Sequence, residues 1–262
     1  MIFSDRDAPQ ARRVYGTCLG ASGRWEPVLT KDERASIDGG SWFSSLSASL
    51  RHDMLRFGRV RRYRDGDRIA TRGDPIFHWM ACAKGSVRLS GAMVSGKLMT
   101  VAYIAPGEWF DDPPVPDDAS WALDAHAHRN TSVLSVDKGD FHKILAGHPE
   151  LFSALFRLQS QRIRDLLGTV SDTQTLALRP RLAKYLINLE QKYGIPTDSN
   201  SRETRIGLPL LQEELAQLVG SSRQRVNQEL KSLQREGFIR SECGAIILQN
   251  RAALLQLWTR QE

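Results

Sequence analysis

Near its C-terminal end the chain contains two neighbouring stretches in which apolar residues recur with the period of a helix. Gly220 lies in the short segment between them. Glycine often ends a helix, because it adopts the left-handed backbone conformation at little cost. The pattern therefore predicts two short helices joined by a tight turn between Leu210 and Leu233. The apolar positions are Leu215, Leu218 and Val219 in the first helix and Val226, Leu230 and Leu233 in the second.

The starts of both predicted helices carry suitable end residues. Glu213 and Glu214 stand in the first turn of the first helix, where the helix dipole favours negative charge. Ser221 or Ser222 caps the second helix by accepting a hydrogen bond from a free backbone amide. Gln224 follows Ser221 by three residues, which is the spacing of a capping box.

The polar face of the second helix is rich in amide and basic side chains. Such side chains can bind phosphates and base edges in a major groove. An ordinary helical hairpin with a solvated polar face is the alternative, but the tight turn, the cap and the amide-rich face together favour a DNA-reading helix. The expected DNA-binding residues are Ser222, Arg223, Gln224, Arg225, Asn227, Gln228 and Lys231.

Two short apolar runs follow this helix and predict a β-hairpin wing. Residues 236–240 lead into the first strand, 241–244 form a turn, and 245–248 form the second strand. The module is therefore a winged helix-turn-helix. The stretch EELAQLVGSSRQRVNQELKSLQREGFI resembles the C-terminal domain of the Crp/Fnr superfamily of bacterial transcription regulators.

This resemblance implies individual roles for the polar residues. Arg223, Gln224 and Gln228 should face base edges, whereas Ser222, Arg225 and Lys231 should contact phosphates, which position the protein without specifying a sequence. Some members carry glutamate where Gln224 stands and arginine where Gln228 stands. Because an amide suits adenine better than cytosine or guanine, we expect a half-site different from that of the cyclic-AMP receptor.

Two segments with different sequence patterns precede the predicted strands in the N-terminal part of the chain. Residues 1–40 are rich in Arg, Asp, Gly, Ser and Ala without a sustained period, so we expect a poorly ordered or loosely docked extension. Residues 41–57 show a helical stripe that favours core packing. The stripe consists of Phe43, Leu46, Leu50, Met54 and Phe57.

From Gly58 to about Asp140, short apolar runs alternate with turn residues, which indicates an all-β unit. The clearest strands are 85–90, 98–104 and 130–136. The segments RRYRDGDRIATRGDP, GSVRLS and APGEWF are similar in order and spacing to the β-roll of cyclic-nucleotide-binding domains, the usual N-terminal sensor of the same superfamily. The resemblance implies an antiparallel β-roll.

The segment after Gly107-Glu108 departs from the cyclic-nucleotide pattern. Where the resemblance leads us to expect a glutamate for the ribose and an arginine for the phosphate, the chain has Asp112 and Trp121, followed by Ala122. Its three prolines lack amide donors, and its four aspartates add negative charge. An unpaired phosphate charge is costly to bury, so we expect that cyclic AMP does not bind. The degenerate pocket thus comprises Glu108, Asp112, Trp121 and Ala122.

Three interpretations of this loop stay open. It is a relic without a ligand, it holds a neutral or cationic ligand against Trp109 and Trp121, or it contacts another protein. A metal site is not expected, because His126 and His128 alternate on a predicted strand without further ligands. The three cysteines, Cys18, Cys82 and Cys243, lie far apart and argue against an iron–sulfur cluster.

Between the two modules, Glu150 opens a long predicted helix that reaches about Thr173. Its apolar positions are spaced by alternating steps of four and three, a heptad-like pattern over nearly three repeats. Burial within one subunit is the alternative, but the position between the modules and the resemblance favour a parallel homodimer. The dimer residues are Phe152, Phe156, Gln159, Ile163, Leu166 and Val170, of which Gln159 could set the register.

Composition and charge agree with this organisation. The net charge is +6, and residues 176–262 carry 13 Lys and Arg against 9 Asp and Glu, so +4 of it lies there. A basic balance suits a polyanionic partner. The chain has no apolar run of about 20 residues and no apolar signal segment at its N-terminus. We therefore expect a cytoplasmic protein with reduced thiols.

We expect an α+β protein: an extension (1–40), an antiparallel β-roll sensor (41–148), a dimerisation helix (149–175) and a winged helix-turn-helix (176–262). The leading hypothesis is a homodimeric, sequence-specific transcription regulator that binds palindromic double-stranded DNA. RNA polymerase would be a further partner of an activator, the effector is unknown, and we expect no cofactor and no membrane partner. The alternative is a ligand-sensing or protein-interaction module with weak or no DNA binding. An enzyme is not expected, because no nucleophile motif or glycine-rich phosphate loop is present.

Overall fold

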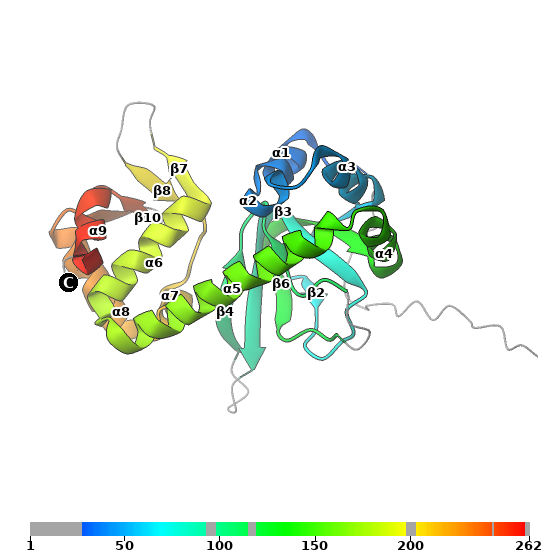
Figure 1. Ribbon diagram of the computed structural model, residues 1–262. Coiled ribbons are helices and arrows are strands. Elements are labelled where there is room, and N and C mark those ends of the chain that lie inside the picture. The colour runs from blue at the N-terminus through cyan, green and yellow to red at the C-terminus, as the bar shows by residue number, and fades with distance from the viewer. Residues whose placement is uncertain (1–27, 93–97, 115–118, 198–202, 243, 260–262) are drawn as a thin grey trace, which may run out of the picture.

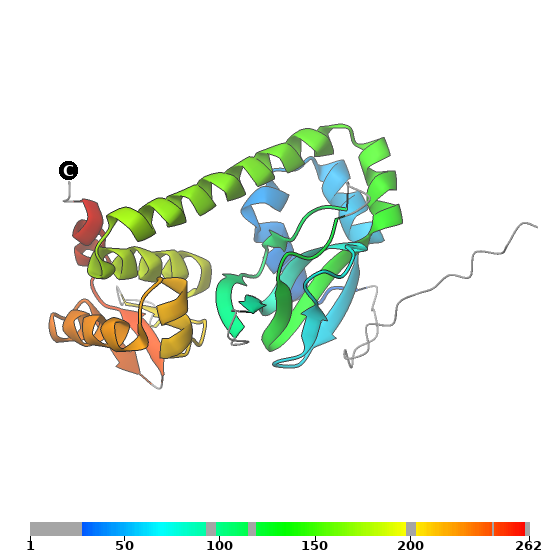
Figure 2. The ribbon, with the colours of Figure 1, turned by 90° about the horizontal axis from the view of Figure 1, so that it is seen from below.

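The computed structural model describes residues 28–92, 98–114, 119–197, 203–242 and 244–259. A β-roll with helices packed against it forms the N-terminal half, and a helical unit with a small sheet forms the C-terminal half (Figure 1). One long helix, α5 (Glu150–Thr175), runs from the first to the second, which is clearest from below (Figure 2). The mixed content of helices and antiparallel strands confirms the α+β class.

The β-roll is a six-stranded antiparallel sheet in which β1, β6, β3 and β4 lie in this order, while β2 pairs with β6 and β5 pairs with β3. Strands β3 and β6 are longer than the runs that we predicted at 85–90 and 130–136, because they continue through bulges. The strands are β1 (Arg59–Tyr63), β2 (Arg68–Ala70), β3 (His78–Ala92), β4 (Leu98–Ile104), β5 (Trp109–Phe110) and β6 (Asp124–Asp137).

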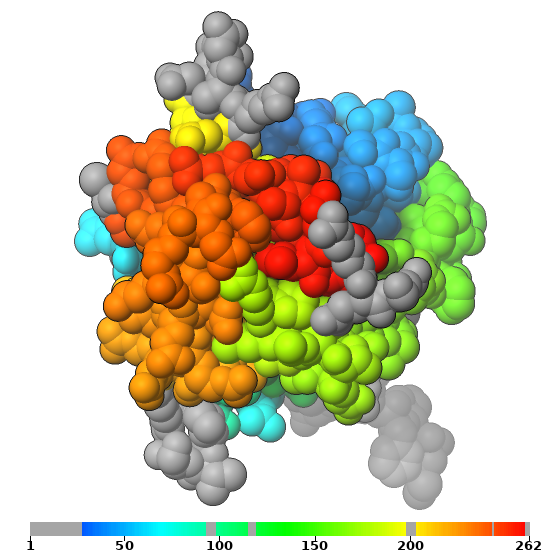
Figure 3. All heavy atoms as spheres, turned by 90° about the vertical axis from the view of Figure 1, so that its left-hand side faces the viewer, coloured from blue at the N-terminus to red at the C-terminus, as the bar shows by residue number. Residues whose placement is uncertain are grey.

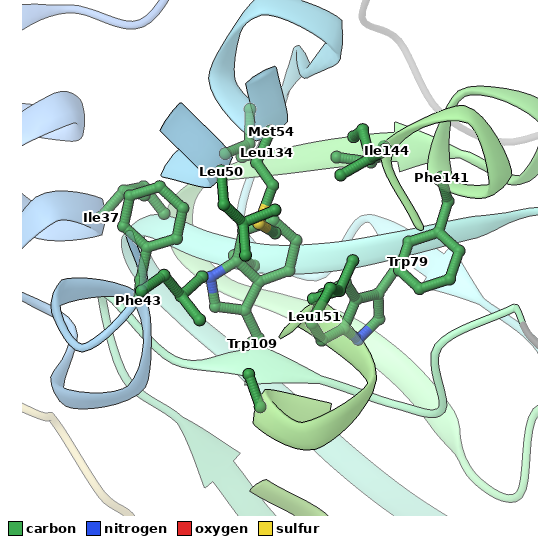
Figure 4. Close-up of a cluster of buried hydrophobic side chains, with 14 of the residues drawn as sticks. Ile37, Phe43, Leu50, Met54, Trp79, Trp109, Leu134, Phe141, Ile144 and Leu151 are labelled. Carbon is green, nitrogen blue, oxygen red and sulfur yellow. The ribbon is translucent and has the colours of Figure 1, made fainter. Parts of the chain in front are cut away.

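Four short helices accompany the roll: α1 (Lys31–Gly39), α2 (Ser41–Ser44), α3 (Ala48–Phe57) and α4 (Lys138–Gly147). The predicted stripe over residues 41–57 is buried at Phe43, Leu46, Leu50 and Met54. The single helix that we expected there is divided, because the Ser47 hydroxyl accepts the Leu50 amide and starts α3 anew. Figure 4 shows Phe43, Leu50 and Met54 of this stripe in the buried cluster that also contains Trp79 and Trp109.

Our expectation for residues 1–40 is wrong for its last part. Helix α1 is capped by Thr30 and packs its buried Ile37 into the core of the roll. The buried Glu33 carboxylate is held by Arg62 of β1 at 2.8 Å. Burial raises the Glu33 pKa, but the hydrogen bonds with Arg62, Ser132 and the Thr30 backbone outweigh burial and lower the pKa to about 2. Residues 1–27 lie outside the described residues.

The C-terminal half begins with α6 (Leu178–Tyr193) and ends with α9 (Arg251–Thr259), and these two helices pack together. Between them lie α7 (Gln212–Leu218), α8 (Arg223–Arg235) and a four-stranded antiparallel sheet in the order β7-β8-β10-β9. Its strands are β7 (Gly194–Pro196), β8 (Thr204–Ile206), β9 (Ile239–Glu242) and β10 (Ala245–Leu248). Strands β9 and β10 are the predicted wing, whereas the sequence analysis did not predict the short strands β7 and β8.

Candidate nucleic-acid interface and sensor loop

Helices α7 and α8 are joined by the tight turn that the sequence predicts. Gly220 has a φ of +65°, in the left-handed region where side chains are strained. The hydroxyl of Ser222, rather than that of Ser221, accepts the Arg225 amide at 3.4 Å and caps α8. The capping box that we expected from Ser221 is therefore wrong, because the helix begins one residue later.

Helix α8 buries one face and exposes the other. Val226 and Leu233 are fully buried against the helical core, and Leu230 packs at its margin, as the periodicity predicts. The helix lies at the end of the molecule that Figure 3 shows, where the helix-turn-helix forms part of the orange surface. We call the exposed side chains of its polar face the recognition face; they are Arg223, Gln224, Arg225, Gln228 and Lys231.

The other two expected DNA-binding residues lie at the margins of this face. Ser222 is exposed but its hydroxyl caps the helix. Asn227 is half-buried, and its Oδ1 accepts a hydrogen bond from Gln212 of α7 at 3.3 Å. The lower half of the face continues into an open hollow lined by Gln228, Lys231, Gln234 and Arg235. All four lining side chains are cationic or amide groups.

Two arginines of α6 hold the reading helices in place. Arg179 lies 2.5 Å from the Glu236 carboxylate and donates to Ser232 at 3.2 Å, so it fixes the C-terminal end of α8. Arg181 donates to the carbonyls of Thr173 and Val219 at 3.0 and 2.8 Å. Arg181 therefore joins the end of α5 to the turn before α8, a link that the sequence pattern did not reveal.

The four expected pocket residues do not surround a common space. Trp121 is only 6% exposed and packs with Phe110 inside the roll, where the ring centroids are 6.1 Å apart. Ala122, the next residue, is exposed. The Glu108 carboxylate points the other way, to Lys192 of α6 at 2.7 Å, and Asp112 accepts from Gln159 of α5 at 2.9 Å.

Trp109 and Trp121 also belong to different clusters. Trp109 packs against Trp79 under the helices, with ring centroids 4.4 Å apart and planes tilted by 38°, whereas Trp121 lies inside the roll. The two rings therefore do not form the joint platform that we considered for a cationic ligand. Residues 115–118, with Pro116, Asp117 and Asp118, lie outside the described residues.

The structure places an arginine beside this loop that the sequence analysis missed. Arg162 of α5 donates to the Asp111 carbonyl at 2.9 Å and to the Trp109 carbonyl at 2.5 Å. Burial lowers the pKa of Arg162, while the charges of Asp112, Asp111 and Glu108 raise it. No signal in the loop itself could have revealed this residue, because it lies about 50 positions later in the chain.

Asp111 has an unusual environment within the same loop. Its φ is +60°, and its Oδ2 atom is buried without a hydrogen-bond partner among the described residues. Burial raises the pKa of Asp111 to about 7. A hydrogen bond with the Asp112 backbone and the charge of Arg162 oppose this rise, whereas the negative charge of Asp112 adds to it. A carboxyl group that titrates near neutrality therefore lies where the loop meets α5.

Helix α5 leaves most of its predicted dimer face uncovered. Its start is anchored on the roll by the buried Leu151, Ala154 and Leu155. Gln159 is engaged within its own subunit, by Asp112 and by Arg162. An exposed apolar stripe runs along the rest of the helix and consists of Phe152, Phe156, Ile163, Leu166, Leu167 and Val170.

Histidines and cysteines do not converge in the described part of the chain, where no group of three or more potential ligands could hold a metal ion. His126 and His128 are half-buried, and the His128 Nε2 donates to the Pro209 carbonyl at 2.8 Å. Cys82 is fully buried, which raises its thiol pKa and disfavours the reactive thiolate. No helix in the described ranges is long and apolar enough to cross a membrane.

Several polar contacts join the outer face of the roll to the C-terminal half of the molecule, α6 to α9, which we call the reading unit. Arg88 lies 3.3 Å from Glu214 of α7, and Gln217 of the same helix accepts the Thr100 amide at 2.8 Å. The Ser86 hydroxyl lies 3.0 Å from the Tyr193 hydroxyl at the end of α6. Sequence analysis did not predict this contact surface between the two halves.

Two family models match the chain. The model of the cyclic nucleotide-binding domain matches residues 60–148, and the model of the Crp-like helix-turn-helix domain matches residues 180–257. Together they cover the β-roll with α4 and nearly all of the C-terminal half.

Known proteins agree with these matches. The chain is 29% identical over 206 residues to the cyclic AMP receptor protein of Thermus thermophilus, which covers 77% of this chain and 88% of that protein. It is 25% identical over 185 residues to a CRP-like cAMP-activated global transcriptional regulator of Mycobacterium tuberculosis, covering 71% and 81%. The solved structure of FixK2 from Bradyrhizobium japonicum shares the fold, with a TM-score of 0.67 at 20% identity over 76% of this chain and 96% of that one.

Proposed function

Because this chain belongs to the Crp/Fnr family of transcription regulators and carries its DNA-binding helix-turn-helix, we propose that it binds a palindromic operator as a parallel homodimer and does not need cyclic AMP. In this proposal the β-roll senses (41–148, with α1 attached to it), α5 dimerises (149–175), and the C-terminal part reads DNA (176–262). The protein works in the cytoplasm, and it is not an enzyme.

The observation that carries the proposal is the recognition face. Gln224, Gln228 and Lys231 are exposed on the side of α8 away from its buried residues, and the exposed Arg223 and Arg225 flank them at the helix start. Two arginines of α6 hold this helix and the turn before it in place. Arg223, Gln224 and Gln228 are proposed to read base edges, where amides pair best with adenine. Ser222, Arg225 and Lys231 are proposed to bind phosphates. Asn227 lies at the margin of the face, where it accepts a hydrogen bond from Gln212 and so links α8 to the start of α7.

The exposed stripe on α5 supports the dimer. Phe156 is 70% exposed and Ile163 is 57% exposed, which is unusual for apolar side chains that recur along one helix face. A parallel pairing of α5 with its copy would cover this stripe and place two reading helices on half-sites about 34–36 Å apart, one turn of B-DNA. The register must then come from the apolar residues, because the Gln159 amide is engaged in its own subunit.

Trp121 supports independence from cyclic AMP. A buried indole occupies the roll interior at the position where the resemblance leads us to expect an arginine, and Ala122 lacks the hydroxyl that the resemblance leads us to expect after it. An anionic phosphate buried near Trp121 would lack the charged donor that offsets its desolvation. Relatives named for cyclic AMP therefore do not define the effector of this chain.

The decisive experiment is binding-site selection from random DNA duplexes with the purified full chain, without ligand and at two salt concentrations. We expect a palindrome to be enriched, with an affinity that falls steeply as salt rises because phosphate contacts release counterions. The selection is repeated with cyclic AMP, which should change neither the sequence nor the yield. Enrichment only with cyclic AMP would contradict ligand independence and leave the DNA-reading function intact.

A second candidate function follows from the contacts between the roll and α7. A module that senses a ligand or binds a protein through the roll, with little DNA affinity, would use the same contacts between its halves, from Arg88 to Glu214 and from Thr100 to Gln217. Absence of any enrichment at both salt concentrations, with and without cyclic AMP, would favour this candidate. An activator would additionally contact RNA polymerase, which is tested by transcription from a promoter that carries the selected site.

A further inference from the structure

Strand β5 and the residues after it lie against α5 through hydrogen bonds to backbone carbonyls. The Arg162 guanidinium donates to the carbonyls of Trp109 and Asp111, and through its Nη1 atom also to Gln159 at 2.8 Å. The Gln159 amide in turn donates to the Asp112 carboxylate. Three residues of the segment 109–112, which we call the sensor loop, are thus fixed by two side chains that lie one helical turn apart on α5; they are Trp109, Asp111 and Asp112.

The charges around Arg162 favour the same arrangement. Glu108, Asp111 and Asp112 all stabilise the guanidinium, which partly offsets the cost of its burial. The planar guanidinium has five donors in a fixed fork, so it can hold two carbonyls at once in a defined geometry. A lysine at this position would keep the charge and lose the fork.

The other end of α5 is joined to the reading unit just as directly. Arg181 binds the carbonyls of Thr173 and Leu176 at the end of α5 and that of Val219 before the turn. Lys184 binds Asp172 at 2.7 Å. A continuous 26-residue helix therefore lies between the loop held by Arg162 and the turn held by Arg181.

We infer that Arg162 is a positioning residue that fixes α5 to the sensor loop without an effector, so that the reading helices are already oriented for DNA in the ligand-free protein. This inference rests on the proposed function. The Arg162 side chain thus makes the connection between the roll and α5 without a bound ligand. It predicts that operator affinity depends on Arg162 although this residue lies far from the recognition face.

The test uses the full-length chain, the duplex enriched by selection and an unrelated duplex of equal length. Arg162→Gln removes the charged fork, and Arg164→Gln is the matched control, because Arg164 is exposed on the same helix and donates to its neighbour Gln161. Affinity is measured by fluorescence anisotropy with and without cyclic AMP. Sedimentation gives the dimer mass, and circular dichroism gives the folded fraction.

We expect Arg162→Gln to lower the affinity for the selected duplex at least about tenfold, with unchanged affinity for the unrelated duplex and unchanged dimer mass. Arg164→Gln should bind as the wild type does. Arg162→Lys carries the test if Arg162→Gln fails to fold, and it should show a smaller loss of the same kind. Added cyclic AMP should not restore the affinity of Arg162→Gln or of Arg162→Lys for the selected duplex.

Two outcomes overturn the inference while the DNA-reading part of the proposed function stands. The first is a folded Arg162→Gln protein that binds the selected duplex as tightly as the wild type. The second is a wild type that binds the selected duplex only with cyclic AMP. Failure of the wild type to bind any duplex specifically would instead refute the proposed function, and the inference with it.

Discussion

The Arg88 guanidinium lies 3.3 Å from the Glu214 carboxylate and joins β3 of the roll to α7 of the reading unit. Glu214 is 7% exposed and also accepts the Leu211 amide at 2.9 Å, which fixes the start of α7. Tyr103 of β4 also belongs to the hydrophobic core of the C-terminal half. The orientation of the reading helices therefore depends on residues of the sensor sheet.

We predict that the Arg88–Glu214 pair couples the stabilities of the two halves. Arg88→Ala leaves a buried carboxylate without its cation, and Glu214→Gln removes the charge that holds Arg88. A double-mutant cycle on the free energy of unfolding in urea should give a coupling of about 1 kcal/mol, within the range for contacting charged residues. The exposed pair Lys143–Asp140 on α4 is the control and should couple by well under that amount. A coupling of zero for Arg88 and Glu214 would mean that the halves are held by the other contacts alone.

The Asp111 carboxyl should make stability depend on pH near neutrality. Its pKa is raised from 3.8 to about 7 in the folded protein, so between these values the folded state binds more protons than the unfolded chain. The contribution of Asp111 to the free energy of unfolding is therefore fully present below about pH 4 and declines as pH rises towards 7.

Asp111→Asn should remove this decline, and asparagine also tolerates the positive φ at this position. The measurement is urea unfolding of both proteins between pH 5 and 8, and the difference between them isolates Asp111 from other titrating groups. Asp165→Asn, at an exposed position on α5, should keep the wild-type profile. Parallel profiles for wild type and Asp111→Asn would show that this carboxyl is ionised throughout.

The stripe on α5 predicts a variant that is folded but monomeric. Ile163 is exposed in the single subunit, so Ile163→Lys should leave folding intact while it places a charge in the apolar contact between two copies. Sedimentation equilibrium should give the mass of one chain for Ile163→Lys at concentrations where the wild type has twice that mass. Gln161→Lys adds the same charge on another face of α5 and should stay dimeric. A dimeric Ile163→Lys protein would move the interface elsewhere.

Much of this architecture could be predicted from local sequence because local rules decide it. The helical stripes at Phe43–Met54 and at Val226–Leu233, the positive φ at Gly220 and the wing at 239–248 follow from periodicity, glycine conformation and turn residues. What failed depends on contacts distant in the chain. Helix α1 is held by Arg62, and the sensor loop by Arg162, and neither partner is visible in the segment that it stabilises. Strands β7 and β8 were missed because three-residue strands carry little pattern.

The recognition face predicts two different effects for two of its residues. Gln228 is proposed to read a base edge, so Gln228→Ala should relax or alter the preference at one position of each half-site, by about 1–3 kcal/mol of discrimination. Lys231 is proposed to bind a phosphate, so Lys231→Ala should weaken binding to all duplexes alike and reduce the slope of log affinity against log salt by about 1 for each phosphate that is no longer neutralised. Both side chains are exposed, so neither change should alter folding.

Repeating the site selection with Gln228→Ala checks the first effect, and salt titrations with Lys231→Ala check the second. If Gln228→Ala left the preference unchanged at every base, Gln228 would lose its assigned role, because a contact that specifies a base cannot be removed without changing which bases are tolerated.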